Sequence, residues 1–290
     1  MRNKKILNSP RLLELKKRRR RAKEKKVAIA LVILVLFITG LTYLSRINKL
    51  NIKNINITGN KVIDSNEIKS IVETKLEGKY LGLFPRTNLF LYPKNKIKNE
   101  LETSIKRLYG ISLTISNLND LNIEVAERQA LFTWCGEKPP DIFSSIEERC
   151  YFLDDTGYIF DEAPFFSAGV YFKFYGSVGS YEEHPYGKYF YSDVFKNLVL
   201  FIKTVEELKL KPETLFVDDK NDIQITLASS KSIANKPKIF LKYDADFNKA
   251  IENLQAAIST DPLKSNIEKK YSSMLYIDLR YGNKVYFKFE

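Results

Sequence analysis

The sequence predicts an α+β protein with a single N-terminal transmembrane helix, a small domain ordered strand, helix, helix, strand, strand, and a mixed α/β domain built on a largely antiparallel sheet. Three observations lead to this prediction. The first is an uncharged apolar run near the N-terminus, and the second is a series of segments up to residue 125 with the apolar spacing of helices or strands. The third is a set of short strand patterns around two amphipathic helices after residue 125. The predicted parts are a tail (1–26), a transmembrane helix (27–45), a first domain (46–126) and a second domain (127–290).

The transmembrane prediction rests on residues 27–45, which hold no charged side chain. At about 1.5 Å rise per residue, this run spans about 30 Å of bilayer hydrocarbon. The core helix of a soluble protein is the alternative, but such a helix usually carries a polar stripe, and here Thr39, Thr42 and Ser45 lie only near the end. A removable signal peptide is disfavoured because no Ala-x-Ala-like site follows.

The tail carries almost all of the net charge. Residues 1–26 hold thirteen basic and two acidic side chains, a net charge of +11 out of +12 for the chain. A basic cluster directly before a membrane span predicts a cytoplasmic N-terminus, with the rest of the chain outside the cell membrane. Nucleic-acid binding by the basic run is the alternative, and we do not expect it, because a run this close to a span is more often a topology signal.

The first domain begins with a strand and a helix. Residues 51–59 alternate apolar and polar side chains and end at the turn-forming pair Gly59-Asn60. A helix follows, capped by Asp64 or Ser65 and stopped by Gly78.

A second helix and two strands complete the first domain. The helix starts after Pro93, and Gly110 marks its predicted end. Residues 111–116 and 121–125 alternate around a polar turn, which predicts an antiparallel pair.

The second domain shows short strands and two amphipathic helices. The helices are predicted over residues 194–210, with Pro212 as the stop, and after a cap at Asp246. Strands are predicted at residues 132–134, 151–153, 215–217, 223–227 and 239–243, and a final hairpin at 275–281 and 284–289 around Gly282-Asn283.

No catalytic motif stands out, and we expect neither an enzyme nor a cofactor site. A single histidine, His184, lies in a turn-like stretch, and Asp154-Asp155 precedes Thr-Gly, as in a turn between strands. With one histidine and two cysteines, the sequence does not predict a metal site.

Three segments resemble the FtsQ/DivIB family of bacterial division proteins. They are LNIEVAERQALFTW (121–134) with its Glu127-Arg128 pair, YFLDDTGYIF (151–160), and YIDLRY (276–281), which is similar to the family's Asp-Leu-Arg-Tyr segment. The order of elements before them resembles a POTRA domain, a small module that lies just outside a membrane and binds extended polypeptide.

The two cysteines, Cys135 and Cys150, bracket a long loop between two predicted strands. If those strands pair, the cysteines lie opposite each other, and a disulfide would close about 15 residues, worth about 3 kcal/mol on the loop-entropy model. Two unpaired buried thiols are the alternative.

The final hairpin is the predicted partner surface. Since the sequence ends with this strand, we expect its outer edge to be uncovered and able to accept an extended segment from another protein. An edge protected by Lys284 and Lys288 is the alternative. The resemblance implies that an FtsB-like partner binds along the segment Tyr281, Gly282, Asn283, Lys284, Val285, Tyr286 and Phe287.

The resemblance therefore implies a scaffold of the division complex. Such a protein would sit in the cell (inner) membrane at the division septum, bind FtsB- and FtsL-like proteins, and act indirectly on the septal wall synthase. An envelope secretion or assembly module whose POTRA-like domain binds translocating polypeptide is the alternative. A membrane-bound wall hydrolase is a third.

Overall fold

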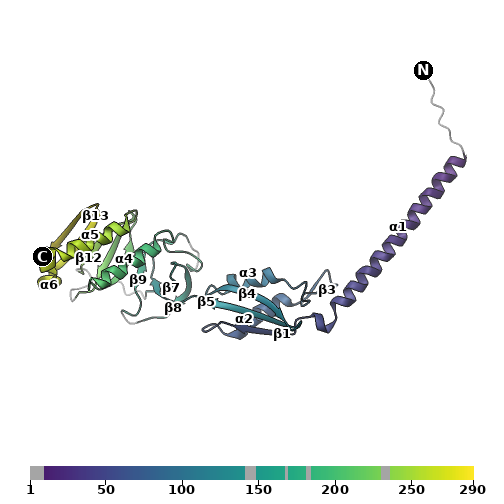
Figure 1. Cartoon of the computed structure of the whole chain (residues 1–290), viewed down its shortest axis with the longest axis horizontal. Coiled ribbons are helices and arrows are strands. Elements are labelled where there is room, and N and C mark those ends of the chain that lie inside the picture. The colour runs from purple at the N-terminus through teal and green to yellow at the C-terminus, as the bar shows by residue number, and fades with distance from the viewer. Residues whose placement is uncertain (1–9, 141–147, 167–168, 181–183, 230–235) are drawn as a thin grey trace, which may run out of the picture. The chain divides into compact units, whose positions relative to one another are not determined.

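The computed structural model (Figure 1) describes residues 10–140, 148–166, 169–180, 184–229 and 236–290, without the side chains of 10–13. It forms two compact units, Met1–Ser104 with Gly110–Ala126 and Ile105–Tyr109 with Glu127–Glu290. The sequence predicted residues 105–109 in the first domain. They belong to the second unit because Arg107 is buried there, with its guanidinium 2.8 Å from Asp161 Oδ2 and stacked over Phe160.

Helix α1 (Pro10–Ser45) is the one helix of the described residues that is long and apolar enough to cross a membrane. Its large apolar side chains are exposed from Leu15 to Leu44. The predicted span began at residue 27, whereas the helix begins at Pro10, because the basic stretch before the span is rich in good helix formers. An Arg20–Glu24 ion pair one turn apart supports this extension.

The first unit places two helices against a three-stranded sheet. After the 3-10 turn η1 (Asn48–Leu50), the elements are β1 (Asn54–Thr58), α2 (Ser65–Leu76), a short ladder of β2 (Lys79–Tyr80) and β3 (Phe84–Pro85), α3 (Lys94–Ser104), β4 (Leu108–Ser116) and β5 (Asp120–Glu127). The sheet order is β1-β5-β4, with β1 parallel to β5. The fully buried side chains of α2 and α3 make the core with alternate residues of β4 and β5.

The helix ends in this unit differ in part from the prediction. Asp64 caps α2, accepting a hydrogen bond from the Asn66 amide at 2.9 Å, as expected. The prediction that the second helix runs to Gly110 was wrong. Helix α3 ends at Ser104, and Gly110 lies inside β4 with a φ of +61°. Ile105 and Leu108 are buried beyond the helix, so the apolar spacing continued past its real end.

The second unit is built on a nine-stranded mixed sheet ordered β14-β13-β12-β11-β10-β9-β6-β7-β8. Most neighbours are antiparallel, and β9 is parallel to both β6 and β10, as β12 is to β13. The strands are β6 (Phe132–Trp134), β7 (Cys150–Leu153), β8 (Ile159–Ala163), β9 (Lys173–Tyr175), β10 (Pro212–Val217), β11 (Asp222–Leu227), β12 (Lys238–Lys242), β13 (Met274–Tyr281) and β14 (Lys284–Phe289).

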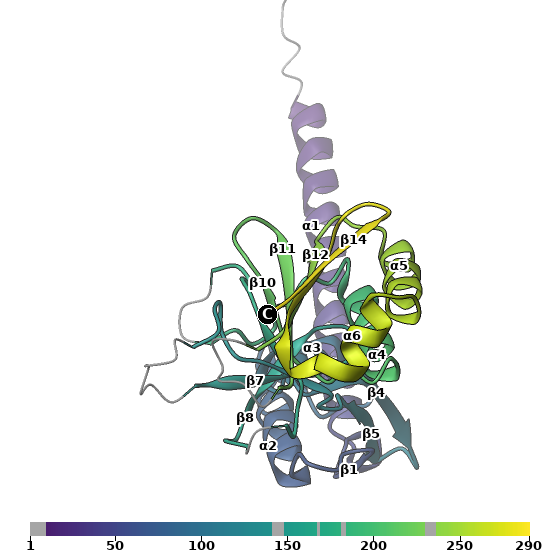
Figure 2. The ribbon, with the colours of Figure 1, turned by 90° about the vertical axis from the view of Figure 1, so that its left-hand side faces the viewer.

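Three helices cover one side of this sheet (Figure 2): α4 (Phe195–Glu207), α5 (Phe247–Ser259) and α6 (Leu263–Lys270). The prediction of two helices was wrong, since α6 adds a third. Its eight residues are too short for a clear apolar period, and only Leu263 is buried. Pro212 opens β10 and does not stop α4, which already ends at Glu207.

A substitution of Gly59 tests the packing of the first unit. This residue has a φ of +90°, and a Cβ at this position would overlap the carbonyl oxygen of Val125. We expect Gly59→Ala to lower the free energy of unfolding by more than about 3 kcal/mol, since backbone strain adds to a clash with neighbouring main chain. Gly82→Ala is the matched control: its φ is +72° but nothing lies within 4 Å of the added methyl group. Denaturant unfolding followed by circular dichroism would measure both, and equal losses would contradict this account of Gly59.

Candidate partner-binding edge

The hairpin of β13 and β14 forms one edge of the large sheet. Among the described strands, β14 has a single neighbour, β13. The loop is Gly282-Asn283, with Gly282 at a φ of +67° and Tyr281 paired with Lys284. Gly282 therefore supplies the left-handed backbone that a two-residue hairpin loop requires.

The register of β14 tells which backbone groups face outward. The Glu290 amide donates a hydrogen bond to Ser273 O at 2.9 Å, toward the β13 side. Because alternate residues of a paired strand face its neighbour, Lys284, Tyr286 and Lys288 turn their backbone groups to β13. Val285 and Phe287 then direct an N–H and a C=O away from the sheet.

The side chains of β14 divide between its two faces. Val285, Phe287 and Phe289 are half-buried and pack against the core. On the other face Tyr281 is 58 % and Tyr286 48 % exposed, and their rings meet edge to face with centroids 5.2 Å apart. The edge thus combines outward backbone groups with a pair of accessible tyrosine rings.

Helix α5 supports the hairpin loop. Asn253 Nδ2 donates a hydrogen bond to Gly282 O at 2.9 Å. A pocket of about 260 Å³ opens beside this contact, with Lys249, Asn253 and Arg280 in its lining. Asn253 could not be identified from the sequence, because its role depends on a contact between residues 29 positions apart, and only its place on the polar side of α5 could have suggested it.

Arg280 ties the hairpin to the middle of the sheet. Its Nε and Nη2 donate to the two carboxylate oxygens of Asp278 at 2.9 and 2.6 Å, and its Nη1 donates to Asp222 Oδ2 at 2.5 Å. The guanidinium also lies over the Phe240 ring, 4.9 Å from its centroid. The hydrogen bonds to Asp278 are the largest cause that raises the pKa of Arg280 above its usual range. The side chain therefore stays charged and fixes the last residues of β13.

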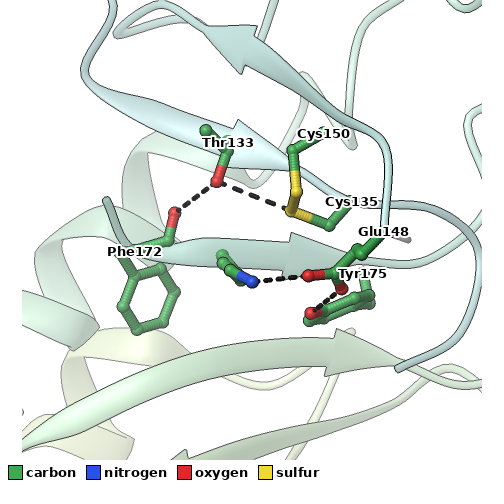
Figure 3. Close-up of a disulfide and its surroundings, with 7 residues drawn as sticks. Thr133, Cys135, Glu148, Cys150, Phe172 and Tyr175 are labelled. Carbon is green, nitrogen blue, oxygen red and sulfur yellow. Dashed lines mark hydrogen bonds and ion pairs between the residues drawn. A yellow bond between two sulfur atoms is a disulfide. The ribbon is translucent and has the colours of Figure 1, made fainter. Parts of the chain in front are cut away.

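The disulfide joins Cys135 to Cys150 across the start of β7 (Figure 3). It closes the loop that follows β6. Beside it, the Glu148 carboxylate binds Lys173 and accepts a hydrogen bond from the Tyr175 hydroxyl. Burial, followed by the bond to Glu148, raises the pKa of Tyr175, so this phenol remains a donor.

Among the residues that the structure describes, one group of side chains has the spacing of metal ligands, and it lies at this disulfide. Ligand atoms of Cys135, Glu148 and Cys150 lie within 4.8 Å of one another. Metals bind thiolates, whereas both sulfurs here are joined in a disulfide, and the carboxylate already has two partners. The arrangement does not suit a metal ion.

Asp154 forms the turn between β7 and β8. It is 4 % exposed, its Oδ1 accepts hydrogen bonds from the Thr156 and Tyr158 amides at 2.8 and 3.0 Å, and its Oδ2 accepts from Arg128 Nη1 at 2.5 Å. The Arg128 guanidinium also lies over the Tyr158 ring, with 4.0 Å to its centroid. Both carboxylate oxygens are thus engaged in holding the turn.

Searches against protein-family models and against curated proteins find no match for this chain.

Replacing Arg280 tests whether this side chain stabilises the edge. In Arg280→Met the carboxylate of Asp278, almost fully buried, loses its partner, and we expect the free energy of unfolding to fall by about 2–3 kcal/mol. Lys288→Met, an exposed lysine on the same hairpin, should change it by less than about 0.5 kcal/mol. Denaturant unfolding would measure both, and a similar effect of the two variants would contradict the proposed clamp.

Proposed function

We propose that this protein is a non-enzymatic bitopic scaffold of the bacterial divisome, similar to FtsQ/DivIB proteins. In this proposal α1 crosses the cell (inner) membrane at the division septum, the N-terminus is cytoplasmic, and the part of the chain after α1 lies outside the cytoplasm. The observation that carries the proposal is the edge strand β14, which directly follows the Asp278-Leu279-Arg280-Tyr281 segment.

The charged residues in the segments that resemble FtsQ/DivIB proteins support this proposal by their contacts. Arg128, from the Glu-Arg pair, binds Asp154 of the Leu-Asp-Asp-Thr-Gly turn. Asp278 and Arg280 bind each other within β13. The charged residues of these motifs therefore have defined structural roles in the second unit, as expected if the motifs maintain a shared fold.

The part of the first unit that follows α1 is proposed to be POTRA-like. Its element order is strand, helix, helix, strand, strand, and its last strand lies between the other two. Its position directly after α1 also agrees with a module that lies close to the membrane surface.

The proposed activity is capture of an FtsB-like bitopic protein by strand addition. A partner segment would pair with the outward N–H and C=O groups of Val285 and Phe287, and Tyr281 and Tyr286 would contact its side chains. An FtsL-like protein would join the same complex, which would act indirectly on the septal wall synthase.

A proline on the edge tests strand addition directly. Val285→Pro removes an N–H that faces away from β13, so the hairpin should remain folded while partner capture falls at least about tenfold. Co-purification of the tagged full-length protein with an FtsB-like partner would measure capture. Val285→Thr keeps both the N–H and the branched shape, and we expect it to bind as the native chain does.

A charge reversal separates backbone pairing at the β14 edge from nonspecific electrostatic binding of the partner. Lys284→Glu changes a side chain on the exposed face of β14 and should weaken capture less than Val285→Pro does. Unchanged capture in a folded Val285→Pro variant would show that the partner does not use this edge.

Localisation distinguishes the divisome proposal from an envelope secretion or assembly module, the second candidate, which rests on the POTRA-like element order. A fluorescent fusion of the full chain should concentrate at mid-cell in dividing cells. An even distribution around the envelope at all stages would favour the secretion module.

A further inference from the structure

Exposed apolar side chains gather in the segment between α2 and α3. Within residues 80–92, Leu81 is 92 % and Phe90 76 % exposed, and Leu83 and Leu91 are also exposed. Single exposed apolar residues are common on protein surfaces, but four within eleven positions of one loop call for a partner that covers them. We name these four residues the apolar loop cluster.

Hydrogen bonds hold this loop against the end of α1. Asn88, only 3 % exposed, donates from Nδ2 to Ser45 O at 3.0 Å, and Ser45 is the last residue of the helix. The Leu89 amide donates to Leu50 O at 3.0 Å. Arg46 Nη2 donates to Leu83 O at 3.3 Å, within the cluster itself.

Asn51 strengthens this junction from the other side. Its Nδ2 donates to Ser45 O at 3.0 Å and to Ile47 O at 2.8 Å, while its Oδ1 accepts from Thr87 Oγ1 at 2.9 Å. The Ile52 amide donates to Thr87 O at 2.9 Å. Two asparagines therefore fix the loop to the helix end through several backbone and side-chain bonds.

This attachment sets the height of the loop relative to a bilayer. Residues 27–45 span about 30 Å as a helix, so Ser45 lies close to the hydrocarbon boundary. The headgroup region extends roughly 5–7 Å beyond that boundary. A loop bonded to the Ser45 carbonyl lies in this interfacial layer, where apolar and aromatic side chains are stabilised.

We propose that the apolar loop cluster inserts into the outer leaflet of the membrane that α1 crosses, and so fixes the first unit against the lipid surface. The lipid is the occupant that the hydrogen bonds to Ser45 favour. Arg46 and Lys49, next to the helix end, add positive charges for lipid phosphates. This inference rests on the proposed membrane crossing of α1, but it is independent of any division partner.

Depth-dependent quenching of site-specific labels tests the proposal in the full chain reconstituted into phosphatidylcholine and phosphatidylglycerol vesicles. The two cysteines are joined as a disulfide, so a single introduced thiol is labelled selectively. A polarity-sensitive fluorophore is attached in Leu81→Cys and in Phe90→Cys, and quenching by lipids with a nitroxide at the headgroup is measured. Circular dichroism checks that each labelled chain is folded.

Two further positions provide the controls. Val62→Cys, at a residue 68 % exposed in the same unit but beyond the far end of β1, should show only weak background quenching. Leu34→Cys, in the middle of the apolar part of α1, should be quenched by lipids with a nitroxide deep in the acyl chain.

The outcomes are distinguishable. Strong quenching at residues 81 and 90, several times that at 62, supports insertion of the cluster. If 34 is quenched but 81 and 90 behave like 62, the cluster does not contact lipid, and α1 still crosses the membrane. If 34 is not quenched either, the membrane crossing fails, and this proposal fails with it.

Discussion

The bond network of Arg280 is the interaction on which the candidate edge depends. One guanidinium joins Asp278 in β13 to Asp222 at the start of β11, two strands further into the sheet, and covers the Phe240 ring between them. The hairpin loop is held by α5 through Asn253. Strand addition requires a template that does not shift when a new strand pairs, because each lost backbone contact weakens the ladder. The contacts of Arg280 near the end of β13, and of Asn253 with the hairpin loop that follows, meet this requirement.

The sequence predicted the edge hairpin well because its signals are local. Alternating apolar and polar residues on both sides of Gly282-Asn283 predicted strands at 275–281 and 284–289. In the structure these strands are Met274–Tyr281 and Lys284–Phe289. The caps at Asp64 and Asp246 were also local signals, and both side chains accept a hydrogen bond from the first turn of their helix. The partner role of residues 281–287 came from family resemblance and stays a prediction.

The features that the sequence missed depend on distant contacts. Strand β9 lies between β6 and β10, with Thr133 and Thr214 both opposite Lys173, about 40 residues away in either direction. Its three residues, Lys-Phe-Tyr, lie in a stretch of many aromatic residues where apolar periodicity is uninformative. Parallel pairing leaves no turn signal in the sequence. The burial of Arg107 was also not predicted, because its partner Asp161 lies 54 residues further along the chain.

If the second unit lies outside the cytoplasm, as proposed, the Cys135–Cys150 disulfide would record that topology. Because cytosolic thiols are generally kept reduced, the bond would form only after the second unit had left the cytoplasm. A copy that failed to insert would retain two thiols and the open loop between them. Its less stable second unit would then be exposed to the quality-control proteases of the cytosol, so oxidation separates correctly delivered molecules from misdelivered ones.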